Sequence, residues 1–185
     1  MVRSVRLRLD AETGRRAEAA QALSELAGED LANLHLDEEW TFCMSLLAEA
    51  CALLGDASPA RKLYDVLSPY SGLNVIAVPE VLFGSVDRVL GVLAGMLGRW
   101  EEAEGHFTAA LEMDGRMGAR PWVAHTRHDH AAMLLARDGP GDRERAGEFL
   151  TEAISTYEEL GMDSWAERAR VLAGGQSESS TRSMR

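Results

Sequence analysis

The stretch Leu97-Gly-Arg-Trp-Glu-Glu-Ala-Glu-Gly-His-Phe107 decides the fold. Gly98 is a helix stop, and the residues after it begin a second helix on which the small residue Ala103 marks a close helix contact. Gly98 has a counterpart 43 residues earlier, at Gly55, and another 43 residues later, at Gly141. A fixed period of this length is typical of stacked helical repeats, so the chain is predicted to be a tandem array.

Four further columns of the sequence repeat at the same step of 43 residues. Small residues in one column let the two helices of a unit approach closely, and large residues in another fill the space between neighbouring units. This many columns at one period predict a tandem repeat. The columns are Ala60, Ala103 and Ala146; Tyr64, Phe107 and Leu150; Leu67, Ala110 and Ala153; and Trp122 and Trp165.

Each unit is expected to fold as two helices joined by a turn, which makes the predicted fold class all-α, a stack of antiparallel helical hairpins. Residues 1–10 carry too little apolar content for a helix, so we expect them to be poorly ordered and the leading unit to lack its first helix. Residues 174–185 are rich in Gly, Ser, Gln and Thr and are predicted to be a disordered tail. The helical domain then covers residues 11–173, with units at about 11–37 (partial), 38–69, 80–116 and 120–160 and a capping helix at 163–173.

The middle unit resembles the tetratricopeptide repeat over residues 84–110, and the neighbouring units match the same pattern less completely. The resemblance implies an α-solenoid in which the first helix of each pair lines a concave wall. The matching positions are the Leu90-Gly91 pair, the turn residue Gly98, the aromatic residue Trp100, and Ala103, Phe107 and Ala110 on the second helix.

Three further stretches extend the resemblance to about residues 14–173: Met117-Gly-Ala-Arg-Pro-Trp122, Met133-Leu-Leu-Ala-Arg137 and Gly141-Asp-Arg-Glu-Arg-Ala146. They look like the C-terminal repeat arm of actinobacterial signal-transduction ATPases, which include LuxR-family and adenylate-cyclase-like regulators. The resemblance implies a sensor or scaffold in bacterial signalling or transcriptional regulation. The sequence has no Gly-x-x-x-x-Gly-Lys-Ser/Thr loop and no helix-turn-helix after residue 173, so the ATPase and DNA-binding activities of that family do not carry over.

Composition excludes several classes of partner. The 185 residues carry a formal net charge of −11, which argues against binding nucleic acid or anionic lipid. The longest apolar stretches are interrupted by charged residues, and the N-terminus lacks the apolar core of a signal peptide, so we expect no membrane span. Cys43 and Cys51 are eight residues apart on one predicted helix, about 12 Å along its axis, too far for a disulfide. A cytoplasmic location is therefore expected.

The sequence contains one dense cluster of potential metal ligands. His125, His128 and Asp129 have the spacing of one helix face, and His130 falls at a packing position. A zinc site would need a fourth ligand or a water with supporting contacts. We favour two groove-lining histidines and one packing histidine over a metal site, and we expect no cofactor and no enzymatic activity.

The favoured function is to bind a protein or peptide in the concave groove. The alternative is a sensor of a small effector, enclosed by the same groove with the histidines as polar anchors. The uncapped N-terminal end is expected to pair with another copy or another domain. Arg88, His125 and His128 are predicted to be solvent-accessible on one wall. The predicted groove residues are Phe42, Ser45, Glu49, Ser85, Arg88, Val92, His125, His128 and Asp129.

Overall fold

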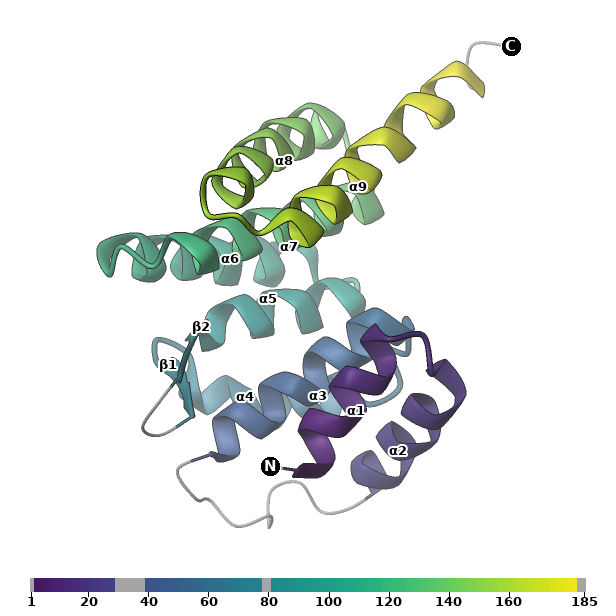
Figure 1. The fold of residues 1–185 in the computed structure, drawn as a ribbon, viewed down its shortest axis with the longest axis vertical. Coiled ribbons are helices and arrows are strands. Elements are labelled where there is room, and N and C mark those ends of the chain that lie inside the picture. Colours follow the sequence, from purple (N-terminus) through teal and green to yellow (C-terminus); the bar gives the residue numbers. More distant parts are fainter. Residues whose placement is uncertain (1, 29–38, 78–80, 183–185) are drawn as a thin grey trace. The chain divides into compact units, whose positions relative to one another are not determined.

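The computed structural model describes residues 2–28, 39–77 and 81–182, and most of these residues are helical (Figure 1). The predicted mainly helical fold is therefore confirmed. The chain divides into two compact units, unit 1 at residues 1–110 and unit 2 at residues 111–185. The elements are α1 (Val2–Glu12), α2 (Arg16–Gly28), α3 (Trp40–Leu54), α4 (Ala60–Leu67), a 3₁₀ turn (Ser68–Tyr70), β1 (Asn74–Ala77), β2 (Val81–Ser85), α5 (Val86–Met96), α6 (Trp100–Arg116), α7 (Arg120–Arg137), α8 (Asp142–Glu159) and α9 (Asp163–Arg182).

Unit 1 begins with a complete helical hairpin. Helix α1 packs against α2 and also against α3 (Figure 1). The prediction that residues 1–10 are poorly ordered and that the leading unit lacks a first helix is therefore wrong. Helix α1 packs with few apolar residues, because Leu7 and Ala11 are buried on one of its faces. The buried Asp10 also accepts a hydrogen bond from Arg15, with Nε and Oδ1 2.7 Å apart. Of the predicted partial unit, residues 29–37 lie outside the described residues.

A β-hairpin occupies the region in which the sequence predicted a helix that begins at residue 80. Strands β1 and β2 pair antiparallel, and α5 begins only at Val86. Gly84 has a φ of +77°, a conformation that a right-handed helix does not allow. Ser85 then caps α5, because its side-chain oxygen accepts a hydrogen bond from the Asp87 amide at 3.1 Å. Residues 78–80 lie outside the described part of the chain.

The repeated columns of the sequence correspond to repeated local geometry. Gly55, Gly98 and Gly141 have φ angles of +70°, +70° and +80°, the left-handed conformation that ends or precedes a helix most easily with glycine. The alanines of the next column, Ala60, Ala103 and Ala146, are all fully buried. The predicted turns and close contacts are thus found in both units.

Unit 2 consists of the end of α6 together with α7, α8 and α9, and α8 packs against both α7 and α9. The turn between α7 and α8 is held by the buried carboxylate of Asp142. This carboxylate accepts two hydrogen bonds from Arg137, at 2.7 and 2.6 Å, and one from the Gly139 amide at 2.8 Å. The hydrogen bonds from Arg137 lower the pKa of Asp142 to about 2.

Helix α9 continues to Arg182, past the predicted end at residue 173. The structure has helix through residue 182 where the sequence predicted a tail, and residues 183–185 lie outside the described residues; the disorder of this tail stays a prediction. Each glycine in a helix costs only about 1 kcal/mol relative to alanine, which an established helix can tolerate. Among the helices described, none is both long and apolar enough to cross a membrane.

Two substitutions test the close contact between α5 and α6. A Cβ atom on Gly91 would lie 2.8 Å from the Phe107 ring, and Ala103 is fully buried. We expect Gly91→Leu and Ala103→Leu each to lower the free energy of unfolding by about 1–3 kcal/mol or more, since overpacking forces neighbouring side chains to move. Chemical denaturation measures the effect.

The matched control is Gly105→Ala, since Gly105 lies on α6 and a Cβ there meets nothing within 4 Å. This variant should be as stable as the wild type or more stable by up to about 1 kcal/mol. If the two leucine variants melt within a degree or two of the wild type, the assigned contact between α5 and α6 is incorrect.

Candidate functional site

Six of the nine predicted groove residues belong to unit 1. Phe42, Ser45 and Glu49 lie on α3, while Ser85 precedes α5 and Arg88 and Val92 lie on it. Helix α3 packs against α1 on one side and α5 on the other, so these three first helices form one layer within unit 1. The remaining three residues, His125, His128 and Asp129, lie on α7 in unit 2.

An ion-pair chain links the three first helices of unit 1. Glu49 on α3 accepts a hydrogen bond from Arg8 on α1, with Oε2 and Nε 3.0 Å apart, and its other oxygen pairs with Arg88 on α5. Arg8 also binds Glu12, with Nη1 and Oε2 2.6 Å apart. One carboxylate thus holds two guanidinium groups from two different helices.

The prediction that Arg88 is solvent-accessible is wrong. Its side chain is only 5% exposed, because it packs between α5 and α3 to reach Glu49. The repeat register gives the helix face on which a residue lies, but it does not say whether a neighbouring helix supplies an opposite charge. Arg88 and Glu49, both predicted to contact a ligand, contact each other instead.

The two predicted serines have local structural roles. Ser45 is fully buried, and its hydroxyl donates to the Thr41 carbonyl at 2.7 Å. Ser85 is also fully buried and caps α5. Both hydroxyls are therefore satisfied within unit 1, and neither is placed to meet a ligand.

Apolar side chains remain accessible in unit 1. Phe42 and Phe83 are half-buried and stack edge to face, with ring centroids 5.2 Å apart. Val92 is also half-buried. On the hairpin, Ile76 and Leu82 are cross-strand partners and are 44% and 39% exposed. With two further exposed residues they form the set that we call the hairpin aliphatics: Leu73, Ile76, Val81 and Leu82.

In unit 2, His125 lies inside an aromatic cluster. Its ring centroid is 4.4 Å from that of Trp165 and 5.1 Å from that of Trp122, and its Nδ1 is 2.9 Å from the Tyr157 hydroxyl. The prediction that His125 is solvent-accessible is therefore wrong, because α8 and α9 supply side chains that cover it. His128 is half-buried and meets the edge of the same Trp165 ring at 6.3 Å.

The histidine cluster does not assemble a metal site in the part of the chain that the structure describes. His128 Nδ1 lies 3.3 Å from Asp129 Oδ1, but His125 is engaged with Tyr157. His130 is buried against Phe149, with ring centroids 4.7 Å apart. The search for three or more His, Cys, Asp or Glu side chains placed to hold one metal ion finds none among the described residues.

Unit 1 contains a hydrogen-bonded network that no sequence motif indicates. His106 on α6 places Nδ1 2.8 Å from Asp87 Oδ1 and Nε2 3.0 Å from the Tyr64 hydroxyl. The Tyr64 hydroxyl in turn donates to Glu102 at 3.0 Å. These residues come from three helices, and only Glu102 and His106 have a single-helix spacing, at i and i+4 of α6. The rest of the network is brought together only by the folded chain.

Asp87 fixes the base of the hairpin within this network. It accepts hydrogen bonds from the Ser71 hydroxyl at 2.8 Å and the Gly72 amide at 2.7 Å. Burial raises the pKa of Asp87, but the hydrogen bonds from His106, Gly72 and Ser71 outweigh it and hold the pKa below its usual value. Asp87 therefore stays charged and accepts from all three groups.

The network has the outline of an acid–histidine–hydroxyl triad but not its chemistry. Burial and the hydrogen bond to Glu102 raise the pKa of Tyr64 above its usual value. An activated nucleophile needs the opposite shift or a free general base. We therefore interpret the Tyr64–His106–Asp87 network as a structural link between α4, α5 and α6.

The two cysteines are inert in this fold. Cys43 and Cys51 are both buried, and they are free thiols. Burial, together with the nearby charge of Asp56, raises the pKa of Cys51 to about 12. Its thiol therefore remains protonated, and it is not a nucleophile.

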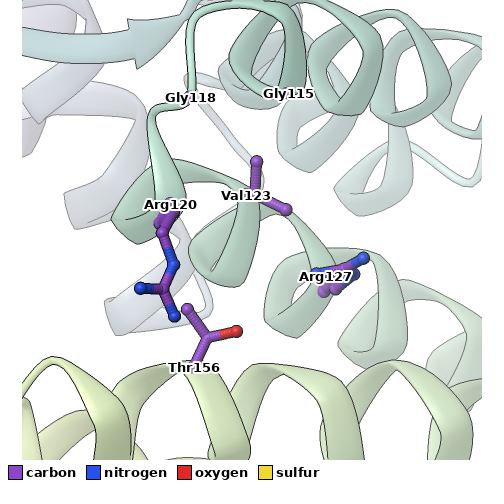
Figure 2. A pocket seen from close by; sticks show the side chains of 6 residues that line it. All are labelled: Gly115, Gly118, Arg120, Val123, Arg127 and Thr156. Carbon is purple, nitrogen blue, oxygen red and sulfur yellow. The ribbon is translucent and has the colours of Figure 1, made fainter.

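Unit 2 has a small pocket between the start of α7 and the last turns of α8 (Figure 2). It has a volume of about 140 Å³. No sequence motif marks this pocket, because its residues come from the end of α6, the turn that follows, α7 and α8. Its lining residues are Gly115, Gly118, Arg120, Val123, Arg127 and Thr156.

Comparisons with known proteins give no relative to this chain. No protein-family model, no curated protein and no solved structure matches it. The resemblance to tetratricopeptide repeats and to the repeat arm of signalling ATPases thus stays a prediction from the residues themselves.

Removal of one member of the ion-pair chain should destabilise unit 1. Arg88→Ala leaves Glu49 with one guanidinium partner instead of two, in a site that is mostly buried. Breaking a buried pair costs about 3–5 kcal/mol when the remaining charge is left unpaired. Because Glu49 keeps Arg8, we expect a smaller but measurable loss in the free energy of unfolding. Urea denaturation measures it.

The matched control is Arg6→Ala on α1. The Arg6 side chain is 81% exposed, and its contact with Asp10 is 3.7 Å long. An exposed substitution of this kind costs under about 0.5 kcal/mol. Equal stabilities of the two variants would show that the pairing of Glu49 with Arg88 does not contribute.

Proposed function

We propose that this chain is a non-catalytic module that binds a protein or peptide segment through unit 1. The observation that carries the proposal is the exposure of the hairpin aliphatics. Contiguous patches of exposed apolar side chains on a soluble protein often mark binding sites. Between Val66 and Val86 the sequence has one charged residue, Glu80, so the preferred segment is aliphatic and carries little charge.

The arrangement of helices supports the same proposal. The first helices of the pairs, α1, α3 and α5, lie side by side in unit 1. The small residues of the repeat are buried where the second helix of a pair packs against the first. Solenoids of the tetratricopeptide type present such layers as extended binding surfaces. A role in bacterial signalling or transcriptional regulation rests on the resemblance in sequence alone.

The polar groups of unit 1 favour binding over catalysis. Glu49 and Arg88 are paired with each other, and Asp87 and His106 belong to the network that ties α5 to α6. Each of these interactions has a structural use. Among the described residues of the two strands, the exposed side chains are the apolar ones of Ile76, Val81 and Leu82, and apolar contact contributes affinity rather than chemistry.

Peptide selection tests the proposal. A random peptide library is selected on the wild-type chain and on the double variant Ile76→Thr/Leu82→Thr, which keeps residues that suit a strand. We expect aliphatic peptides that carry little charge to be enriched on the wild type and to bind the double variant at least tenfold more weakly. Fluorescence anisotropy of the selected peptides gives the affinities.

Val171→Thr is the control, because Val171 is a 68% exposed aliphatic residue on α9. It should bind the selected peptides as the wild type does. Peptides that bind the double variant equally well would move the site away from the hairpin. A selection that yields no saturable binder on the wild type would contradict the proposal.

Purified protein should hydrolyse neither ATP nor simple esters above background. The sequence lacks a phosphate-binding loop. The Tyr64 hydroxyl beside His106 has a raised pKa, and the Tyr157 hydroxyl beside His125 is buried in the aromatic cluster. Phosphate release and chromogenic ester assays measure turnover. Turnover that is lost in Tyr64→Phe or His106→Ala would contradict the non-catalytic assignment.

A further inference from the structure

The pocket of unit 2 places two arginines around one small cavity (Figure 2). Arg120, Val123 and Arg127 follow each other at the i, i+3 and i+7 positions of α7, which puts them on one face. Thr156 lies opposite, on α8. The two arginine Cα atoms are about 10 Å apart along the helix, so their long side chains can both reach an atom group between them.

The size of the pocket suits a small ligand group. It has a volume of about 140 Å³ and is open to solvent on one side. A tetrahedral oxyanion fits this space. Gly115 and Gly118 leave the wall open, since a Cβ at either position would meet nothing within 4 Å.

Both arginines are held by glutamates that can exchange for a ligand. Arg127 Nη2 lies 2.7 Å from Glu152 Oε2, and Arg120 pairs with Glu159. The two glutamate side chains are 54% and 59% exposed. Ion pairs this exposed are worth at most about 1 kcal/mol, so an anion can displace either carboxylate into solvent.

The polar groups suit a phosphate better than a carboxylate. One guanidinium already satisfies both oxygens of a carboxylate, whereas a tetrahedral dianion can accept from two guanidinium groups and a hydroxyl together. The Thr156 hydroxyl now donates to the Glu152 carbonyl at 2.9 Å and can rotate towards a ligand.

We propose that this pocket binds a small oxyanion, either inorganic phosphate or the phosphoryl group of a small metabolite, between Arg120 and Arg127. The site lies in unit 2 and is independent of the peptide-binding function proposed for unit 1. It would make unit 2 responsive to a phosphate-bearing effector.

Isothermal titration calorimetry on the full chain tests the proposal. Sodium phosphate is titrated at neutral pH, with sodium chloride at matched ionic strength as the blank. Glycerol phosphate is titrated in a second arm, and tighter binding of it than of inorganic phosphate would identify a phosphorylated metabolite as the source. We expect saturable binding in at least one arm.

Variants assign the binding to the pocket. Arg127→Gln should weaken binding at least tenfold, and Glu152→Gln should tighten it several-fold, because it removes the competing carboxylate. Arg143→Gln is the matched control, since Arg143 is an exposed arginine of α8 that pairs with Asp138 and does not line the pocket. It should bind as the wild type does.

Two results would overturn the proposal. One is the absence of saturable heat in both arms for the wild type and for Glu152→Gln, a variant that retains both arginines. The other is equal affinity in the wild type, Arg127→Gln and Arg143→Gln. Thermal melts of every variant, followed by circular dichroism, separate a loss of binding from a loss of folding.

Discussion

The close approach of α5 and α6 at Gly91 is the contact on which unit 1 depends. The ring of Phe107 occupies the space that any side chain at position 91 would need. Asp87 lies one turn before Gly91, and His106 directly precedes Phe107, so the same approach brings the carboxylate and the imidazole into hydrogen-bonding distance. The polar network that holds the base of the hairpin therefore exists because two helices touch at a glycine.

The features that follow from local chemistry could be predicted from the sequence. A left-handed turn is easiest for glycine, so Gly55, Gly98 and Gly141 marked turns wherever they recurred. Buried alanines repeated with them, because close helix packing limits side-chain volume. The repeat period and its turn glycines thus predicted several helix ends, such as the end of α3 at Leu54, just before Gly55.

The features that depend on distant partners could not be predicted. Helix α1 has few apolar residues, and its stability comes from packing on α2 and α3. Arg88 lies on the predicted helix face, but a glutamate 39 residues away decides that it is buried. His125 is covered by Tyr157 and Trp165 in the same way. The repeat register gives the direction in which a side chain leaves its helix. Only the folded chain determines which side chains surround it.

The shared carboxylate of Glu49 has a consequence for how unit 1 unfolds. In a repeat array each hairpin contacts only its neighbours, so cooperativity depends on the interactions that cross the interfaces. Glu49 takes part in two such interfaces at once, with Arg8 on one side and Arg88 on the other. If α1 separates from α3, the electrostatic balance around Arg88 changes as well. Fraying at the N-terminal end is thereby transmitted across two interfaces, which couples the outermost helix to the centre of the unit.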